Sequence, residues 1–322
     1  MTNNSSESAV LQSAAATLAT RVKPCPSAKT GVHQWLFSAA LVLKRARHSE
    51  QTACVAIGRA VANCGRPVPD YEIESAVHSA FNSKPGPKTP GWPTPNASLI
   101  AEVGKQGPSL AQLQARSPVE VAALDTDNLI DALFPGDSTK VILSVGVGPK
   151  GAITRPKGTF SGCFEHYAFI VPNPMCAVGG KNKRGEDSRR CLSNTGLRRF
   201  LVVENDPTPF EKLPKEQQSR FGDKAAYIAA NRDKAAAVLW HLAGYAPLTL
   251  IVDSAGRSIH GWFFVAGESE EQCRKFFRYA VALGADRMLW TRCQFVRMPN
   301  GTRDNGKRQS VLYFNPQSME SK

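Results

Sequence analysis

The chain has 322 residues, which allows about two domains of ordinary size. Hydrophobic residues make up 42% of it, a composition that excludes a fully disordered protein. It has 40 Lys and Arg residues against 27 Asp and Glu, and the resulting charge of +13 favours a polyanionic partner. Charge alone leaves ribosomal, nucleic-acid-processing and anionic-membrane proteins open.

The first part of the chain is predicted to be helical. From residue 8 to residue 82, apolar residues recur at spacings that place them on one face of a helix. We therefore expect an N-terminal helical domain over residues 1–82. Five prolines follow within residues 83–97, a density that excludes regular structure and predicts a stiff linker. A second domain is expected over residues 98–322.

The second domain alternates between predicted strands and predicted helices. Two helices are expected at residues 223–243 and 269–283. The strands are short runs rich in β-branched and aromatic residues, at 140–145, 167–171, 199–204, 248–252, 259–265 and 310–314. This alternation predicts an α+β fold in which helices cover one face of a mixed sheet.

An uncharged stretch at residues 235–252 was considered as a membrane span. It is interrupted by Gly244 and Pro247, so a helix, a turn and a buried strand are the better prediction. The first ten residues contain no basic segment followed by an apolar one, which is the pattern of a secretory signal. We expect a cytoplasmic protein without a membrane partner.

One predicted strand ends in two acidic residues, in the sequence FLVVEND at residues 200–206. Residues two apart in a strand point to the same face, so Glu204 and Asp206 are expected side by side. Two carboxylates this close repel each other unless a cation lies between them, and oxygen ligands suit Mg²⁺ or Mn²⁺. The alternative is a surface strand that ends in an ordinary Asn-Asp-Pro turn.

The sequence DSAGRSIHGWF at residues 253–263 predicts a turn between two strands. Ser258 and His260 alternate with Ile259, so the hydroxyl and the imidazole should lie on one face. Together they could bind a phosphate oxygen. The alternative is that His260 is a neutral histidine of the core.

Two further segments combine charge with turns. Residues 286–309 begin with Asp286 and continue with several basic residues, whose guanidinium groups suit phosphates. Residues 303–308 could equally form a solvated surface. A second basic loop, at residues 181–190, precedes the acidic strand and could follow a nucleic-acid backbone.

The cysteines do not predict a metal centre. The chain has eight of them and no C-x-x-C pair, so reduced thiols are expected. Cys163, His166, Cys176 and Cys191 are zinc-type ligands, but their spacing matches no compact zinc motif. We therefore expect no zinc.

The order of these motifs resembles the archaeo-eukaryotic primase superfamily, in particular the primase-polymerases of plasmids, phages and other mobile elements. The resemblance covers roughly residues 140–316. FLVVEND resembles the first motif of the family, SIHGWF at 258–263 its second, and DRMLWTRCQFVR at 286–297 its third. It implies the primase-polymerase catalytic core, a mixed sheet with an RRM-like half. The helical segment at 31–81 resembles a small domain that more often follows this core.

The resemblance also implies roles for individual residues. Glu204, Asp206 and Asp286 would be the catalytic acids and would hold two Mg²⁺ or Mn²⁺ ions. The family more often has Asp at the position of Glu204, and Asp304 competes with Asp286 as the third acid. The nucleotide would be bound by Ser258, His260 and Arg297. The DNA would be bound by Lys181, Lys183, Arg184, Arg303 and Lys307.

The sequence thus predicts a template-dependent nucleotidyltransferase that makes, and extends, primers on single-stranded DNA from nucleoside triphosphates. No phosphate-binding loop of the helicase type is present, so a separate helicase is expected. Preference for ribonucleotides or deoxyribonucleotides stays open. The alternative is a DNA-binding replication initiator with a degenerate active site.

Overall fold

A computed structural model describes residues 4–26, 32–62, 64, 67–82 and 91–320. The chain divides into two compact units, residues 1–91 and 92–322, and each is described by itself. Most of the predicted linker, residues 83–90, lies outside the described residues. Trp92 already belongs to the second unit, because its ring packs edge-on against Phe277 and Trp290. The second unit therefore begins a few residues before the expected position.

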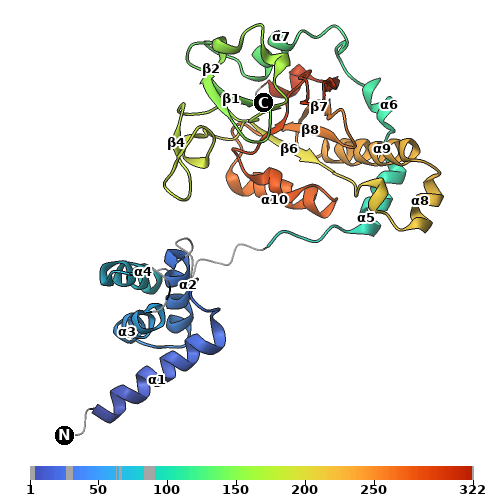
Figure 1. Ribbon diagram of the computed structural model, residues 1–322. Helices are drawn as coiled ribbons and strands as arrows, with labels where there is room; N and C mark the ends of the chain where they lie inside the picture. Colours follow the sequence, from blue (N-terminus) through green and yellow to red (C-terminus); the bar gives the residue numbers. More distant parts are fainter. Residues whose placement is uncertain (1–3, 27–31, 63, 65–66, 83–90, 321–322) are drawn as a thin grey trace. The chain divides into compact units, whose positions relative to one another are not determined.

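The first unit consists of helices α1 (Asn4–Arg21), α2 (Val32–Arg45), α3 (Glu50–Val61) and α4 (Asp70–Asn82) (Figure 1). Its core is formed by residues at helical spacing, among them Leu36, Leu43 and Val77, which are fully buried. Ser49 begins α3 as its N-cap, because its side chain accepts a hydrogen bond from the backbone N–H of Thr52. The helical character predicted for this part of the chain is thus present in the described residues.

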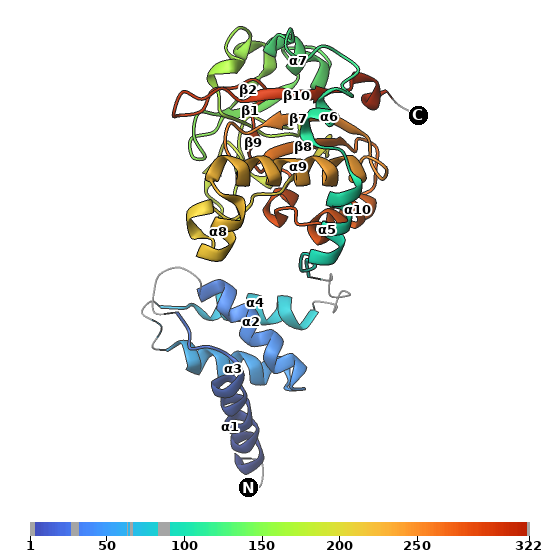
Figure 2. The same ribbon diagram turned by 90° about the vertical axis from the view of Figure 1, so that its right-hand side faces the viewer.

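The second unit contains two four-stranded sheets and a set of helices (Figures 1 and 2). The first sheet has the order β2 (Ile153–Pro156), β1 (Ile142–Gly146), β3 (Phe169–Ile170), β9 (Val296–Arg297). The second has the order β10 (Ser310–Phe314), β7 (Leu248–Asp253), β8 (Ile259–Phe264), β6 (Phe200–Glu204). The helices are α5 (Ala97–Gln106), α6 (Leu110–Gln114), α7 (Thr126–Leu133), α8 (Lys215–Phe221), α9 (Lys224–Leu242) and α10 (Glu270–Ala282). The α+β fold class predicted from the sequence is confirmed.

The strand pairs of the second unit differ from the mixed sheet that was expected. All pairs described are antiparallel. Strands β6 and β7, which α9 connects, do run in the same direction, but β8 lies between them and pairs with both. The crossover therefore gives the split β-α-β arrangement of ferredoxin-like folds without a parallel ladder.

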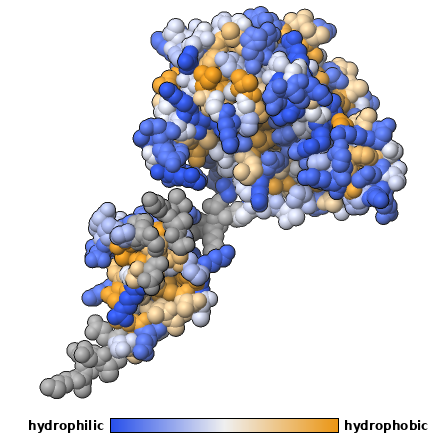
Figure 3. Space-filling model, in the orientation of Figure 1, coloured by the Kyte–Doolittle hydropathy of each residue, from blue (hydrophilic) through white to orange (hydrophobic). Residues whose placement is uncertain are grey.

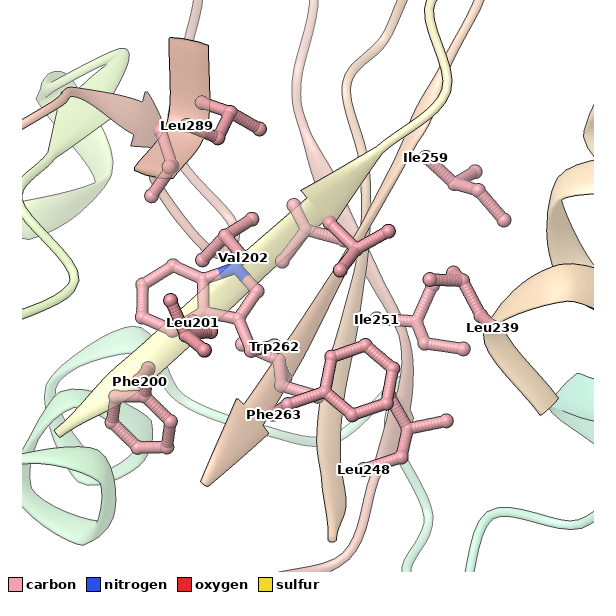
Figure 4. Packing of buried hydrophobic residues seen from close by; sticks show 14 of the residues in the cluster. Phe200, Leu201, Val202, Leu239, Leu248, Ile251, Ile259, Trp262, Phe263 and Leu289 are labelled. Atoms are coloured by element: carbon pink, nitrogen blue, oxygen red, sulfur yellow. The ribbon is translucent and has the colours of Figure 1, made fainter. Parts of the chain in front are cut away.

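Successive side chains along each strand of the second sheet point to opposite faces, so the two faces carry different residues. Helices α9 and α10 cover one face, where Leu239 of α9 packs on Gly261 so closely that a Cβ there would lie 2.4 Å from the leucine side chain. The other face carries Phe200, Val202 and Trp262, whose indole packs edge-on against Phe200 (Figure 4). Glu204 and His260 continue this second face to the end of the strands.

The uncharged stretch at residues 235–252 forms the end of α9, a turn and strand β7, as predicted. Within the described part of the chain, no helix combines the length and the apolar composition that crossing a membrane requires. On the face shown in Figure 3, hydrophilic side chains predominate over the second unit.

Candidate active site

The pairing of β6 with β8 brings two of the sequence motifs together. It sets Glu204 directly opposite His260, and opposed residues of an antiparallel pair share a face. The Ser258 hydroxyl donates a hydrogen bond of 2.5 Å to Oε1 of Glu204, although 54 residues separate them in the chain. Nε2 of His260 lies 3.2 Å from the same oxygen. Glu204, Ser258 and His260 therefore form one cluster.

The surroundings of Glu204 keep its carboxylate ionised. Burial by itself raises the pKa of this group, because it removes water from the charged form. The charge of His260 when protonated, hydrogen bonding by His260 and Ser258, and the charge of Arg297 act in the opposite direction. Together they lower the pKa of Glu204 from 4.5 to about 2. A fixed negative charge therefore lies in this largely buried cluster.

Arg297 reaches Glu204 from β9 of the other sheet, and an aromatic stack holds it in place. Its guanidinium group lies 4.6 Å from the ring centre of Phe169. Phe169 stacks on Phe295 at 5.7 Å, and Phe295 in turn carries the guanidinium group of Arg190 at 4.0 Å. Burial and the neighbouring charge of Arg303 lower the pKa of Arg297. The charge of Arg297 thus acts on the cluster, and nucleotide binding by this residue stays a prediction.

The turn between β7 and β8, residues 254–258, borders the cluster on one side. Ala255 has φ 54°, a left-handed conformation that is uncommon outside glycine. Asp253 stabilises it by accepting a hydrogen bond from the backbone N–H of Ala255 at 2.8 Å. The backbone N–H of Ser254 donates to the carbonyl of Ser258 at 3.2 Å, so hydrogen bonds within the turn fix its shape.

Three arginines from different parts of the chain surround this turn. Arg232 of α9 donates to the Asp253 carboxylate at 2.6 Å and to the carbonyl of Gly256 at 3.0 Å. Arg303 donates to the carbonyl of Ser254 at 3.2 Å. Arg257 belongs to the turn itself. Arg303, predicted to bind DNA, thus lies beside this turn, and DNA binding by it stays a prediction.

Several polar atoms of the cluster are buried without a partner. Among the described residues, no hydrogen bond is made by the Nε atoms of Arg232, Arg257 and Arg303, or by Nδ1 of His260, whereas Nε2 of His260 faces Oε1 of Glu204. Buried donors without a partner are rare in folded proteins because leaving them unmet costs about 1–3 kcal/mol each. Arginine side chains only donate, so the missing partner is an acceptor, and phosphate is the acceptor that arginine suits best.

Asp206 lies just beyond the end of β6 and is paired with Arg257. Because the strand ends at Glu204, the alternation that predicted two carboxylates side by side does not extend to Asp206. One nitrogen of Arg257 donates to both of its carboxylate oxygens, at 2.9 Å each. Asp206 also lines a cavity of about 220 Å³, together with Asn205, Asn231 and Lys234.

Asp286, the third predicted acid, contacts Glu204 through its backbone, whereas its carboxylate is bound elsewhere. The backbone N–H of Asp286 donates to the carbonyl of Glu204 at 2.8 Å. Its carboxylate is exposed and caps a short 3₁₀ helix by accepting from the backbone N–H of Met288. Asp304 is exposed in the turn at 303–306, and its charge acts on Arg297. The choice between Asp286 and Asp304 therefore stays open.

These positions do not form a ready metal site. Within the residues that the structure describes, no group of three or more His, Cys, Asp or Glu side chains could hold a metal ion. Asp206 is paired with Arg257, and Oδ1 of Asp286 accepts from the backbone N–H of Met288. Binding of Mg²⁺ or Mn²⁺ by these three carboxylates stays a prediction. Of the four zinc-type ligands, Cys163 and Cys176 are exposed, whereas Cys191 is buried.

The remaining basic residues predicted to bind DNA lie on the surface. Lys181 opens the hairpin formed by β4 (Gly180–Lys181) and β5 (Asp187–Ser188), which projects from the second unit at the left of Figure 1. Its ammonium group pairs with Asp187 at 2.8 Å. Lys183 and Arg184 are exposed at the tip, and Lys307 is exposed in the turn after Arg303. DNA binding by these residues stays a prediction.

Sequence reasoning did not single out Arg232 or Arg257 as site residues. Arg257 had a signal, because it immediately precedes Ser258 in a turn between two predicted strands. No local sequence pattern pointed to Arg232, since it lies on a helix, 21 residues before its partner Asp253. Only the tertiary fold brings such a residue to the turn.

No family model matches the chain, and no curated protein matches it. A solved structure of the AEP domain of the primase-polymerase of cyanophage S-2L is similar to it, with 15% sequence identity and a TM-score of 0.37. The match covers 61% of this chain and 95% of the phage domain. Similarity at this level does not by itself assign a function.

Proposed function

We propose that the protein is a nucleotidyltransferase of the primase-polymerase type, which binds a nucleoside triphosphate in the cluster around Glu204, Ser258 and His260. The observation that carries this proposal is the set of buried, unpartnered donors beside an ionised carboxylate. The order of the three sequence motifs supports it independently. Synthesis and extension of primers on a single-stranded DNA template is the activity that fits both.

The triphosphate would interact with side chains that are already desolvated. His260 can donate from its ring, and Arg297 is held in place by Phe169. Arg257 and Arg303 add positive charge at the turn between β7 and β8. Donors that are fixed and shielded from water before the ligand arrives bind an anion more strongly than mobile, solvated ones.

In the proposed reaction, the 3′-hydroxyl of a primer or of a first nucleotide attacks the α-phosphorus, and pyrophosphate leaves. Positioning and charge stabilisation account for most of the catalysis in phosphoryl transfer. The arginines and His260 would stabilise the charge that develops on the leaving pyrophosphate. The predicted Mg²⁺ or Mn²⁺, with Glu204 and Asp206 as candidate ligands, remains part of the proposal.

The DNA would be held by charges outside the cluster. The exposed Lys181, Lys183, Arg184 and Lys307 can contact phosphates of a single strand without reading its sequence. The N-terminal unit is assigned to the template or to the priming nucleotide. The proposal also includes a separate helicase and a cytoplasmic location. The replicated element would be a plasmid or a phage.

The second candidate is a DNA-binding replication initiator without catalytic activity. Two observations favour it: Glu204 stands where the family more often has Asp, and Asp206 is occupied by Arg257. This candidate predicts salt-sensitive DNA binding with no nucleotide incorporation under any divalent ion.

The two candidates are separated by a primer-synthesis assay on single-stranded DNA with labelled nucleotides and either Mg²⁺ or Mn²⁺. We expect synthesis by the wild type and its loss in Asp206→Ala, with Glu165→Ala, an exposed acid elsewhere, as the matched control. Unchanged synthesis in Asp206→Ala would refute this site. DNA binding without any synthesis by the wild type would establish the initiator instead.

A further inference from the structure

Arg257 and Asp206 form an ion pair that is suited to exchange. The guanidinium group contacts both carboxylate oxygens at 2.9 Å, yet the two side chains are 35% and 49% exposed. Ion pairs with this exposure contribute little to stability, typically 0–1 kcal/mol. A ligand that binds either residue more strongly can therefore break the ion pair without disturbing the fold.

The same turn contacts both acids at the end of β6. Ser258 donates to Glu204, and its neighbour Arg257 binds Asp206. Arg257 also keeps a buried Nε atom that has no partner in the described residues. A triphosphate in the cluster would offer this guanidinium several oxygens and more negative charge than a single carboxylate does.

The ion pair also opposes binding of a cation at Asp206. A divalent ion would have to compete with Arg257 for the same two oxygens and would lie close to its positive charge, which disfavours binding. Glu204 has different neighbours: its Oε1 accepts from the Ser258 hydroxyl and lies 3.2 Å from Nε2 of His260. The obstacle to a cation at Asp206 itself is therefore one arginine.

We propose that Arg257 is a positioning residue that links the two ligands: it holds Asp206 in the free protein and transfers to the triphosphate, which releases the Asp206 carboxylate for a divalent cation. This inference rests on the proposed function. Coupling between two binding sites is reciprocal. Removal of the Arg257 guanidinium should therefore strengthen cation binding at Asp206, and removal of the Asp206 carboxylate should strengthen binding of the triphosphate.

The experiment measures each ligand without the other, in the full-length chain. Binding of Mn²⁺ alone is followed by the electron paramagnetic resonance signal of the free ion. Arg257→Gln should bind Mn²⁺ at least about fivefold more tightly than the wild type, the lower end of typical coupling. Arg155→Gln, which removes one exposed positive charge from β2, should bind it as the wild type does. The Mn²⁺ affinity of Arg257→Lys should lie between those of the wild type and Arg257→Gln, because lysine keeps the positive charge but lacks the planar guanidinium group.

We call this exchange of Arg257 between Asp206 and the triphosphate the latch. A double-mutant cycle distinguishes the latch from a general effect of removing one positive charge. In an Asp206→Asn background, Arg257→Gln should give no further gain in Mn²⁺ affinity. Binding of dATP in the presence of EDTA provides the reverse measurement, and Asp206→Asn should bind it more tightly than the wild type. Thermal unfolding of every variant checks that each is folded.

The outcomes distinguish this inference from the proposed function. If dATP binds but neither substitution changes the other ligand's affinity, the latch is wrong and the nucleotide site stands. The latch is also overturned if the gain in Mn²⁺ affinity persists with Asn at 206, or if Arg257→Gln binds no Mn²⁺. If no variant binds dATP, both the latch and the proposed function fail.

Discussion

The cluster at the end of β6 and the β4–β5 hairpin both carry positive charge, but they differ in how that charge is satisfied. On the hairpin, Lys181 and Asp187 are 62% and 90% exposed and pair with each other. Asn182 orders the tip by accepting from the backbone N–H groups of Arg184 and Glu186. Around the cluster, the Nε atoms of Arg232, Arg257 and Arg303 and Nδ1 of His260 are buried without a hydrogen-bond partner in the described residues.

This difference supports the proposal that the cluster, and not the hairpin, is the specific binding site. Exposed charges remain solvated, so they attract polyanions without selecting one. Buried donors without partners are costly until a ligand of the right shape and charge meets them. The net charge of +13 therefore suggests the class of partner, whereas the buried arginine Nε atoms are the reason for proposing that it binds at the cluster.

The largest effect is expected from loss of the buried imidazole. His260→Ala should lower kcat/KM for nucleotide incorporation about 10²- to 10³-fold, the usual effect of removing one fixed donor from a shielded site. Steady-state kinetics at saturating DNA measure this effect, with a fluorescence assay of DNA affinity beside them. An alanine variant that incorporates nucleotides at the wild-type rate would remove His260 from the site.

The pH dependence of stability tests the charge of Glu204. Its pKa in the folded protein is lowered to about 2 from 4.5, so its contribution is complete above about pH 4.5 and is lost as the pH falls toward 2. The difference in unfolding free energy between wild type and Glu204→Gln should shrink by up to about 3 kcal/mol across this window. Denaturant unfolding at several pH values measures it, with Asp187→Asn on the hairpin as the matched control. A difference that stays constant with pH would contradict the predicted environment.

Glycine substitutions compare the packing of the two regions. A Cβ at Gly301, which precedes Arg303, would lie 2.1 Å from the backbone oxygen of Tyr167, so Gly301→Ala should cost about 3 kcal/mol. At Gly185 on the hairpin a Cβ would meet open space, and only its φ of 78° opposes alanine, at about 1–2 kcal/mol. Chemical denaturation of both variants gives the two values. Equal losses would mean that the chain around Gly301 is no more tightly packed than the hairpin.

The smallest effect is expected on the hairpin. Lys183→Ala and Arg184→Ala should each weaken binding of single-stranded DNA a few-fold and reduce the slope of log affinity against log salt by about 0.7. The rate at saturating DNA should not change. Titrations at several salt concentrations measure the slope, and a sequence-dependent loss of affinity would argue against simple backbone contacts.

Local periodicity was sufficient to predict much of this fold. The six predicted strands and the helices α9 and α10 are all present, because their apolar patterns match the faces that they bury. The short strands β2, β4, β5 and β9 were not predicted. They have two to four residues each, too few to show a pattern of their own.

The site was predictable where it depends on neighbouring residues in one strand. Ser258 and His260 do share an acceptor, as their alternation with Ile259 indicated. The register that sets Glu204 opposite His260 is a long-range property, and so is the approach of Arg232 and Arg303 to the turn. The position of Asp206 could not be inferred, because alternation holds only within the strand and β6 ends at Glu204.

The central claim is that the cluster at the end of β6 binds the triphosphate of an incoming nucleotide for transfer. Single-nucleotide extension of a primed, single-stranded DNA template tests it most directly, comparing the wild type with Glu204→Gln at saturating DNA. We predict a loss of at least about 100-fold in kcat/KM with unchanged DNA affinity. Extension by Glu204→Gln at the rate of an active wild type would contradict the claim.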